Sequence, residues 1–109
     1  MEKIVKIDGQ EIKLAVNGGT PRIYRSLFHK DLFQGMNNAM DENGDFKDSE
    51  IFENLAFVMA IQGGSLPMTA KIDDWLNGMS NPMAIMEAAP DILDLWLNTK
   101  KETSTAKKE

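Results

Sequence analysis

The stretch that decides the fold is residues 3–16, KIVKIDGQEIKLAV. Asp8-Gly9 lies between two runs of alternating apolar and polar residues, and this dipeptide is a strong signal for a two-residue hairpin turn because glycine accepts a positive φ. In the second run the residues at positions 12, 14 and 16 are apolar, so they share one face of a strand. A lone hairpin is at best marginally stable in water. The rest of the chain is therefore expected to cover this face.

After the hairpin, apolar residues at spacings of three and four predict an amphipathic helix over about 21–40. Thr20 is expected to be the N-cap, with Pro21 at the first helical position, where the missing N–H costs nothing. Gly35 weakens the middle of this helix, so a bend is expected there.

A second helix is expected to begin near Asp48 or Ser49 and to end at Gly63-Gly64. It is apolar nearly all round, which is typical of a central, buried helix. Phe57 is predicted to be buried in its middle. The aromatic residues expected to pack near Phe57 are Tyr24, Phe28 and Trp96.

Two further helical segments follow. Thr69 is expected to cap a short helix that ends near Gly78, and Asn81-Pro82 repeats the signal of a cap followed by proline at the start of the last helix. Pro90 lies inside that last segment, where proline removes a backbone hydrogen bond. A kink or a division into two short helices is therefore expected.

From residue 100 onward the sequence is charged and has nothing to bury, so a disordered tail is expected over 100–109. Residues 1–99 are then one domain. The fold class predicted for it is α+β: an N-terminal β-hairpin followed by a small bundle of four to five helices.

The composition and charge of the chain exclude several classes of function. The chain has 109 residues, no cysteine and a net charge of −5. These values exclude a disulfide framework and a cysteine nucleophile, and they argue against nucleic-acid binding. The longest strongly apolar run, residues 55–61, is far short of the roughly 20 residues that a membrane-spanning helix needs. No membrane partner is therefore expected.

An acidic segment imitates a calcium-binding loop. Asp41, Asn43 and Asp45 match the first three ligand positions of an EF-hand. The turn position, however, is Phe46 rather than glycine, and the bidentate position is Phe52 rather than glutamate. The sequence therefore predicts a solvated acidic loop and no specific metal site.

No catalytic group is expected either. His29 is the single histidine, and Ser26 precedes it by three residues. A working triad also needs an orienting acid and an oxyanion hole, usually from separate elements. The glycine pairs lack the spacing of phosphate-binding loops. No cofactor, and no enzymatic activity, is therefore expected.

Methionine is unusually frequent, with 8 in the chain. The ordinary interpretation is that these side chains fill gaps in the core. The functional interpretation is an adaptable apolar groove that binds a partner's helix. Met79, Met83 and Met86 cluster around a joint marked by proline, and they are the predicted partner-binding residues.

The order of these features resembles a known family. A hairpin leads to YRSLFHKDL at 24–32, then to a buried helix, to DDWL at 73–76, to ILDLW at 92–96 and to a lysine-rich end. Over about residues 3–100 this pattern is similar to the tail assembly chaperones of long-tailed, siphovirus-type phages and prophages. Its most specific part is the stretch at 24–32.

The resemblance implies a non-catalytic protein that binds and solubilises the tape measure protein during tail assembly. It also implies a location in the host cell cytoplasm, absence from the mature virion, and a frameshift-extended form of the chain as a second partner. Self-association is left open. The alternative from another class is a small acidic regulatory module, of the anti-repressor or inhibitor type, that acts through its acidic face at 41–53.

Overall fold

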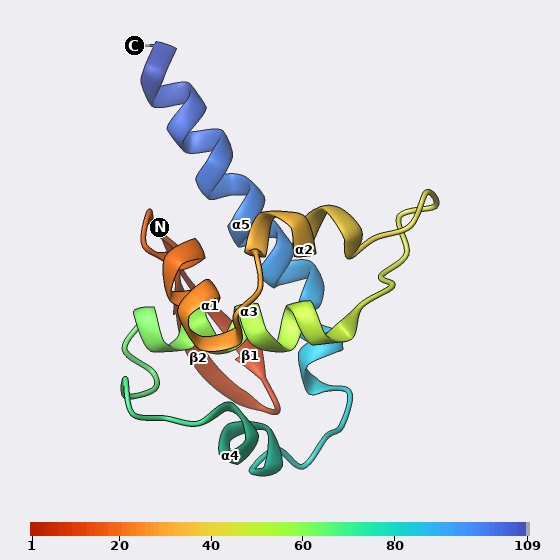
Figure 1. The fold of residues 1–109 in the computed structure, drawn as a ribbon. Helices are drawn as coiled ribbons and strands as arrows, with labels where there is room; N and C mark the ends of the chain where they lie inside the picture. Colours follow the sequence, from red (N-terminus) through yellow and green to blue (C-terminus); the bar gives the residue numbers. More distant parts are fainter. Residues whose placement is uncertain (109) are drawn as a thin grey trace.

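The computed structural model describes the backbone of residues 1–108 and the side chains of residues 1–98 (Figure 1). Its two strands and five helices confirm the α+β fold with an N-terminal hairpin. In chain order they are β1 Glu2–Ile7, β2 Gln10–Ala15, α1 Thr20–Phe28, α2 Leu32–Asn38, α3 Ser49–Gln62, α4 Ile72–Asn77 and α5 Ala84–Lys108.

The hairpin forms as predicted. β1 and β2 are antiparallel, with Val5 opposite Ile12. Asp8 and Gly9 have φ values of 55° and 78°, the positive angles that a tight type I′ turn requires. The Asp8 carboxylate also accepts hydrogen bonds from the backbone N–H groups of residues 80 and 81, at 2.9 and 3.0 Å. The turn therefore also anchors the segment that leads into α5.

Helix α3 is the centre of the molecule. Asp48 caps it by accepting a hydrogen bond from the Glu50 N–H at 3.0 Å, and Gly63 ends it, close to the predicted limits. It packs against β2, α1, α2 and α5, and Figure 1 shows it running across the middle of the fold. The buried residues of this helix are Ile51, Phe52, Asn54, Leu55, Ala56, Phe57, Val58, Met59, Ala60 and Ile61.

The aromatic core differs in one member from the prediction. Phe57 is buried, and its ring centroid lies 6.4 Å from that of Phe28 and 5.8 Å from that of Trp75. Trp96 was expected near Phe57 but lies against Phe33, with 5.7 Å between ring centroids. Helical periodicity identified apolar faces but could not decide which tryptophan faces α3.

The prediction of one helix over 21–40 is wrong, because the chain breaks between α1 and α2. His29 adopts a left-handed conformation, with φ of 57°, and ends α1. The Asp31 carboxylate then caps α2 by accepting from the N–H groups of Phe33 and Gln34, at 2.9 and 3.4 Å. The side-chain cap competes with helix continuation, so the break falls here rather than at Gly35.

Replacing Asp31 with alanine is expected to destabilise the fold by about 0.5–2 kcal/mol, the usual cost of losing a side-chain N-cap. Asp31→Asn retains a capping oxygen and is the matched control. Urea unfolding followed by circular dichroism measures both. Equal midpoints for the alanine variant and the parent would show that the cap does not hold α2 in place.

The start of α1 is also displaced from its prediction, by one residue. Gly19 occupies the N-cap position and Thr20 is already helical. The Thr20 hydroxyl is buried, where it accepts from the Asn17 N–H at 3.0 Å and donates to the side-chain oxygen of Gln62. The threonine therefore ties α1 to the end of α3 instead of capping its own helix.

The last two helices correct the remaining boundaries. α4 begins with Lys71 as N-cap, so Thr69 does not cap it. α5 runs without interruption through Pro90, which shows that the alternative of two short helices is wrong. Pro90 is exposed on α5, and its missing N–H leaves one carbonyl group of the preceding turn without its helical donor.

The α5 backbone is helical as far as Lys108, whereas the sequence predicts disorder over 100–109. The side chains of residues 99–109 lie outside the described part of the chain. The division into a domain at 1–99 and a tail without a role in folding therefore stays a prediction.

Candidate functional site

The three predicted partner-binding methionines lie in different surroundings. Met79 follows α4 and lines a shallow hollow beside the hairpin, together with Trp75. Met83 directly precedes α5 and is 56% exposed. Met86, in the first turns of α5, is half-buried against the core. Of the three, Met83 is the one whose side chain is largely free for a partner.

The structure extends Met83 and Met86 into a longer apolar surface along α5. We name it the α5 stripe, and its members are Met83, Met86, Pro90, Leu93 and Leu97. Their spacings of three, four, three and four place them along one side of a helix. This alternation is the pattern of an apolar seam in helix pairing. Sequence reasoning missed the stripe because it expected Pro90 to interrupt the helix.

The α5 stripe is accessible over much of its length. Leu97 is 51% exposed, Pro90 is exposed, and Met86 and Leu93 are half-buried. Such side chains line the rim of the core rather than fill it. The stripe therefore offers apolar contact area mainly at Met83, Pro90 and Leu97, whereas Met86 and Leu93 also pack against the core.

An aromatic pair flanks this surface. Phe33 of α2 is 57% exposed, and its ring rests on Trp96 of α5. Figure 1 shows α2 crossing close to α5. The break after α1 therefore has a consequence for the site, because it turns α2 so that Phe33 meets α5.

Acidic residues follow the opposite flank of the α5 stripe. Glu87, Asp91 and Asp94 are exposed and recur at helical spacings. Lys3 of β1 lies 3.2 Å from Asp91 and 3.3 Å from Asp94, and the hydrogen bonds to these two carboxylates raise the Lys3 pKa. Exposed pairs of this kind contribute little stability. A negatively charged border nevertheless remains beside the stripe.

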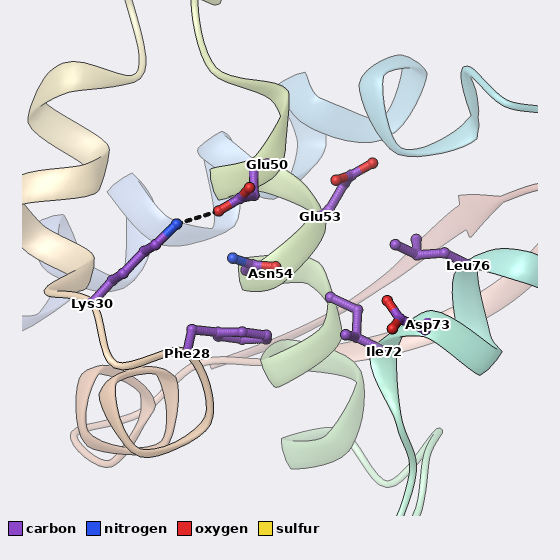
Figure 2. A pocket seen from close by; sticks show the side chains of 8 residues that line it. All are labelled: Phe28, Lys30, Glu50, Glu53, Asn54, Ile72, Asp73 and Leu76. Carbon is purple, nitrogen blue, oxygen red and sulfur yellow. Dashed lines mark hydrogen bonds and ion pairs between the residues drawn. The ribbon is translucent and has the colours of Figure 1, made fainter.

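A separate hollow of about 280 Å³ lies between α1, α3 and α4 (Figure 2). Apolar and acidic side chains share its wall, and an ion pair between Lys30 and Glu50 closes one side. Its volume lies just below the range of about 300–1,000 Å³ that is usual for ligand pockets. Its lining residues are Phe28, Lys30, Glu50, Glu53, Asn54, Ile72, Asp73 and Leu76.

Glu53 is the titrating group that this hollow perturbs. Partial burial, followed by repulsion from Glu50 and Asp48, raises the Glu53 pKa above its usual value. A carboxyl whose pKa is raised by folding holds its proton more tightly in the folded state. The contribution of Glu53 to the free energy of unfolding therefore falls as pH rises from its pKa in the unfolded state through its pKa in the folded state.

Glu53→Gln is accordingly expected to raise the free energy of unfolding at neutral pH. The gain should stay below about 1 kcal/mol, because water still reaches this carboxylate. It should vanish below about pH 3.5, where both states are protonated. Thermal melts across this range measure the effect, with Glu42→Gln in the exposed loop as control. A gain that persists in acid would contradict the assigned cause.

The loop that imitates an EF-hand uses its carboxylate internally. Asp41 Oδ1 accepts hydrogen bonds from the N–H groups of Asn43 and Asp45, both at 2.9 Å. The Phe46 and Phe52 rings pack edge to face, with 4.7 Å between centroids. Among the described residues, no group of three or more histidine, cysteine, aspartate or glutamate side chains could hold a metal ion.

Two further residues considered as catalytic candidates from the sequence, Ser26 and His29, lie in the last turn of α1 and at its C-cap. His29 is exposed, and its backbone N–H donates to the Arg25 carbonyl at 2.8 Å as α1 ends. Ser26 is exposed on α1. Neither faces the hollow of Figure 2 as a lining residue.

No helix in the described part of the chain is long and apolar enough to cross a membrane. Comparison with family models, curated proteins and solved structures gives no match to this chain.

Proposed function

We propose that the chain is a non-catalytic tail assembly chaperone, which binds the tape measure protein in the host cell cytoplasm and keeps it soluble until the tail is built. The pattern over residues 3–100 supports the family. The observation that carries the binding role is the α5 stripe, an exposed apolar seam with helical spacing.

The apolar spacing and the flanking charges of the α5 stripe determine which kind of client helix it would bind. A tape measure protein is a long helical chain, and a helix with apolar residues at a three-four spacing would pack against such a seam. Phe33 and Trp96 would widen the contact on one side. The acidic flank favours client helices that carry lysine or arginine beside their apolar face.

Many weak contacts would suffice. Several copies of the chaperone along one client act together, so each individual contact need not be tight. Apolar contact should also make binding survive moderate salt, because screening weakens mainly exposed charge pairs. The net charge of −5 would keep the coated client dispersed. A frameshift-extended form of the chain would bind through the same stripe.

The regulatory-module alternative depends on the acidic face at 41–53. In the structure several of its carboxylates already have partners within the chain. Asp41 holds its own loop, Asp48 caps α3 and Glu50 pairs with Lys30. This face is therefore less free for a partner than the α5 stripe, and the chaperone is the function that we favour.

Co-purification with stripe variants tests the binding surface. The tape measure protein from the same genome is expressed with a tagged form of this chain. Met83→Asp with Leu97→Asp should abolish the complex without unfolding the chaperone, because both side chains are about half exposed or more. Glu42→Lys with Asp45→Lys, on the acidic loop, is the control and should leave the complex intact. Loss with the loop variant alone would show that the client binds the acidic face rather than the α5 stripe, and absence of a complex with the parent chain would favour the regulatory module.

A further inference from the structure

Within the described part of the chain, residues outside the hairpin hydrogen-bond to the backbone along one of its edges, the edge of β2, but not along the other, the edge of β1. At the β2 edge, the Ser65 hydroxyl accepts a hydrogen bond from the Lys13 N–H at 3.0 Å and donates to the Lys13 carbonyl at 2.9 Å. Gly63 also lies directly against the Lys13 backbone. The turn that follows α3 therefore takes up the backbone groups at the middle of the β2 edge.

The β1 edge has no such cover. Lys13 lies opposite Ile4, and in an antiparallel ladder opposite residues both point their backbone groups inward or both point them outward. Since the Lys13 groups point outward to Ser65, those of Ile4 point outward on the other side, as do those of Glu2 and Lys6. Among the described residues, none hydrogen-bonds to these backbone groups.

The side chains along the β1 edge would complement those of a second copy of the chain related by two-fold symmetry. Glu2, Ile4 and Lys6 share one face of β1, and all three are exposed, with Ile4 at 64%. Around a two-fold axis through Ile4, antiparallel pairing sets Ile4 against the partner's Ile4. The same register sets Glu2 against the partner's Lys6, and Lys6 against the partner's Glu2.

We propose that two copies of this chain pair through β1 in this register and form one continuous antiparallel sheet of two hairpins. The backbone groups that point away from β2 are those that exchange hydrogen bonds with the partner. Unpaired strand edges readily accept a second chain in this way. The occupant of the edge is therefore a second copy, whose charges match, rather than an unrelated strand.

Charge order on the outer face supports this register. Within one chain Lys6 lies opposite Glu11, and Glu2 lies 3.1 Å from Lys13. Across the joined sheet the charges then alternate: Glu11, Lys6, the partner's Glu2 and, diagonally from it, the partner's Lys13. Shifting the register by two residues sets Ile4 against a charged residue, which costs both the apolar and the ionic pairs.

Helix α5 does not take up these edge groups. It packs against β1 through the face that carries Val5 and Ile7, and Lys3 neutralises part of its acidic side by binding Asp91 and Asp94. The proposed pairing is independent of the chaperone role, because it uses neither the α5 stripe nor a client.

Sedimentation of the full chain over a range of concentrations tests the proposal. The parent should show a monomer–dimer equilibrium. Glu2→Lys and Lys6→Glu each set like charges opposite each other and should raise the dimer Kd about tenfold or more. A variant with both changes again has opposite charges facing each other across the interface, so it should dimerise like the parent. A monomer at every concentration would overturn the proposal, as would a dimer indifferent to these reversals.

Two further variants separate pairing from folding. Ile4→Pro removes an N–H that β2 does not use, so it should abolish the dimer while circular dichroism stays unchanged. If this variant instead loses structure, the charge reversals decide. In a chain without cysteine, Ile4→Cys should form a disulfide-linked dimer under oxidation, whereas Glu11→Cys on the outer strand should not. Equal cross-linking at both positions would overturn the register.

Discussion

Phe57→Ala is expected to cost about 3–5 kcal/mol of unfolding free energy, enough to unfold a marginal domain of this size. Phe57 is 2% exposed in the middle of α3, and its ring contacts those of Phe28 and Trp75. Truncation therefore leaves a cavity where α1, α3 and α4 meet. Denaturant unfolding measures the loss.

Phe33→Ala is the matched control, because it removes the same side chain from an exposed site. Phe33 is 57% exposed and loses mainly its contact with Trp96, worth about 0.5–1.5 kcal/mol. If both variants unfold at the same denaturant concentration, α3 is not the centre of the core.

Gly63→Ala is expected to be the other severe substitution. A Cβ atom at this position would lie 2.1 Å from the Lys13 carbonyl oxygen and 2.7 Å from its carbon, and both are backbone atoms of β2. The hairpin would have to move away from α3. The cost should reach or exceed the upper end of the usual 1–3 kcal/mol for overpacking, about 3 kcal/mol.

Gly18→Ala separates this steric effect from the loss of a glycine. A Cβ atom there meets nothing within 4 Å, and Gly18 does not have a positive φ. Alanine should therefore be neutral or stabilise by about 0.4–1 kcal/mol, through the unfolded state. Thermal melts compare the two variants. A Gly63→Ala protein that melts with the parent would contradict the close approach of α3 to β2.

The hairpin and α3 could be predicted because their signals are local. Asp8-Gly9 is itself a turn signal, and the apolar run between Asp48 and Gly63 is bounded at both ends. Gly63 was expected to end α3, and it does. Its second role, making room for the Lys13 backbone, involves a residue far away in the sequence and has no local signal.

The break between α1 and α2 is a feature that the sequence pattern did not predict. Leu27, Phe28 and Leu32 keep helical spacing across it, so periodicity alone favoured one helix. Asp31 before Leu32 is a capping signal that was present but outweighed by the pattern. The local hydrogen-bonding preference of Asp31 prevailed over the apolar spacing.

The candidate site was predicted only in part. Met83 and Met86 belong to the α5 stripe, but Met79 lies beside the hairpin. Pro90, Leu93 and Leu97 were missed because proline was expected to break the helix. Proline removes one backbone hydrogen bond from a helix, yet α5 continues through the exposed Pro90.

The soluble yield of the tape measure protein tests the central proposal most directly. The client from the same genome is expressed alone, with this chain, and with the Met83→Asp, Leu97→Asp variant. We expect the client to aggregate alone, to stay soluble with the parent chain in a complex that co-purifies, and to aggregate again with the variant. A soluble fraction unchanged by this chain, also when a frameshift-extended form is included, would contradict the chaperone function.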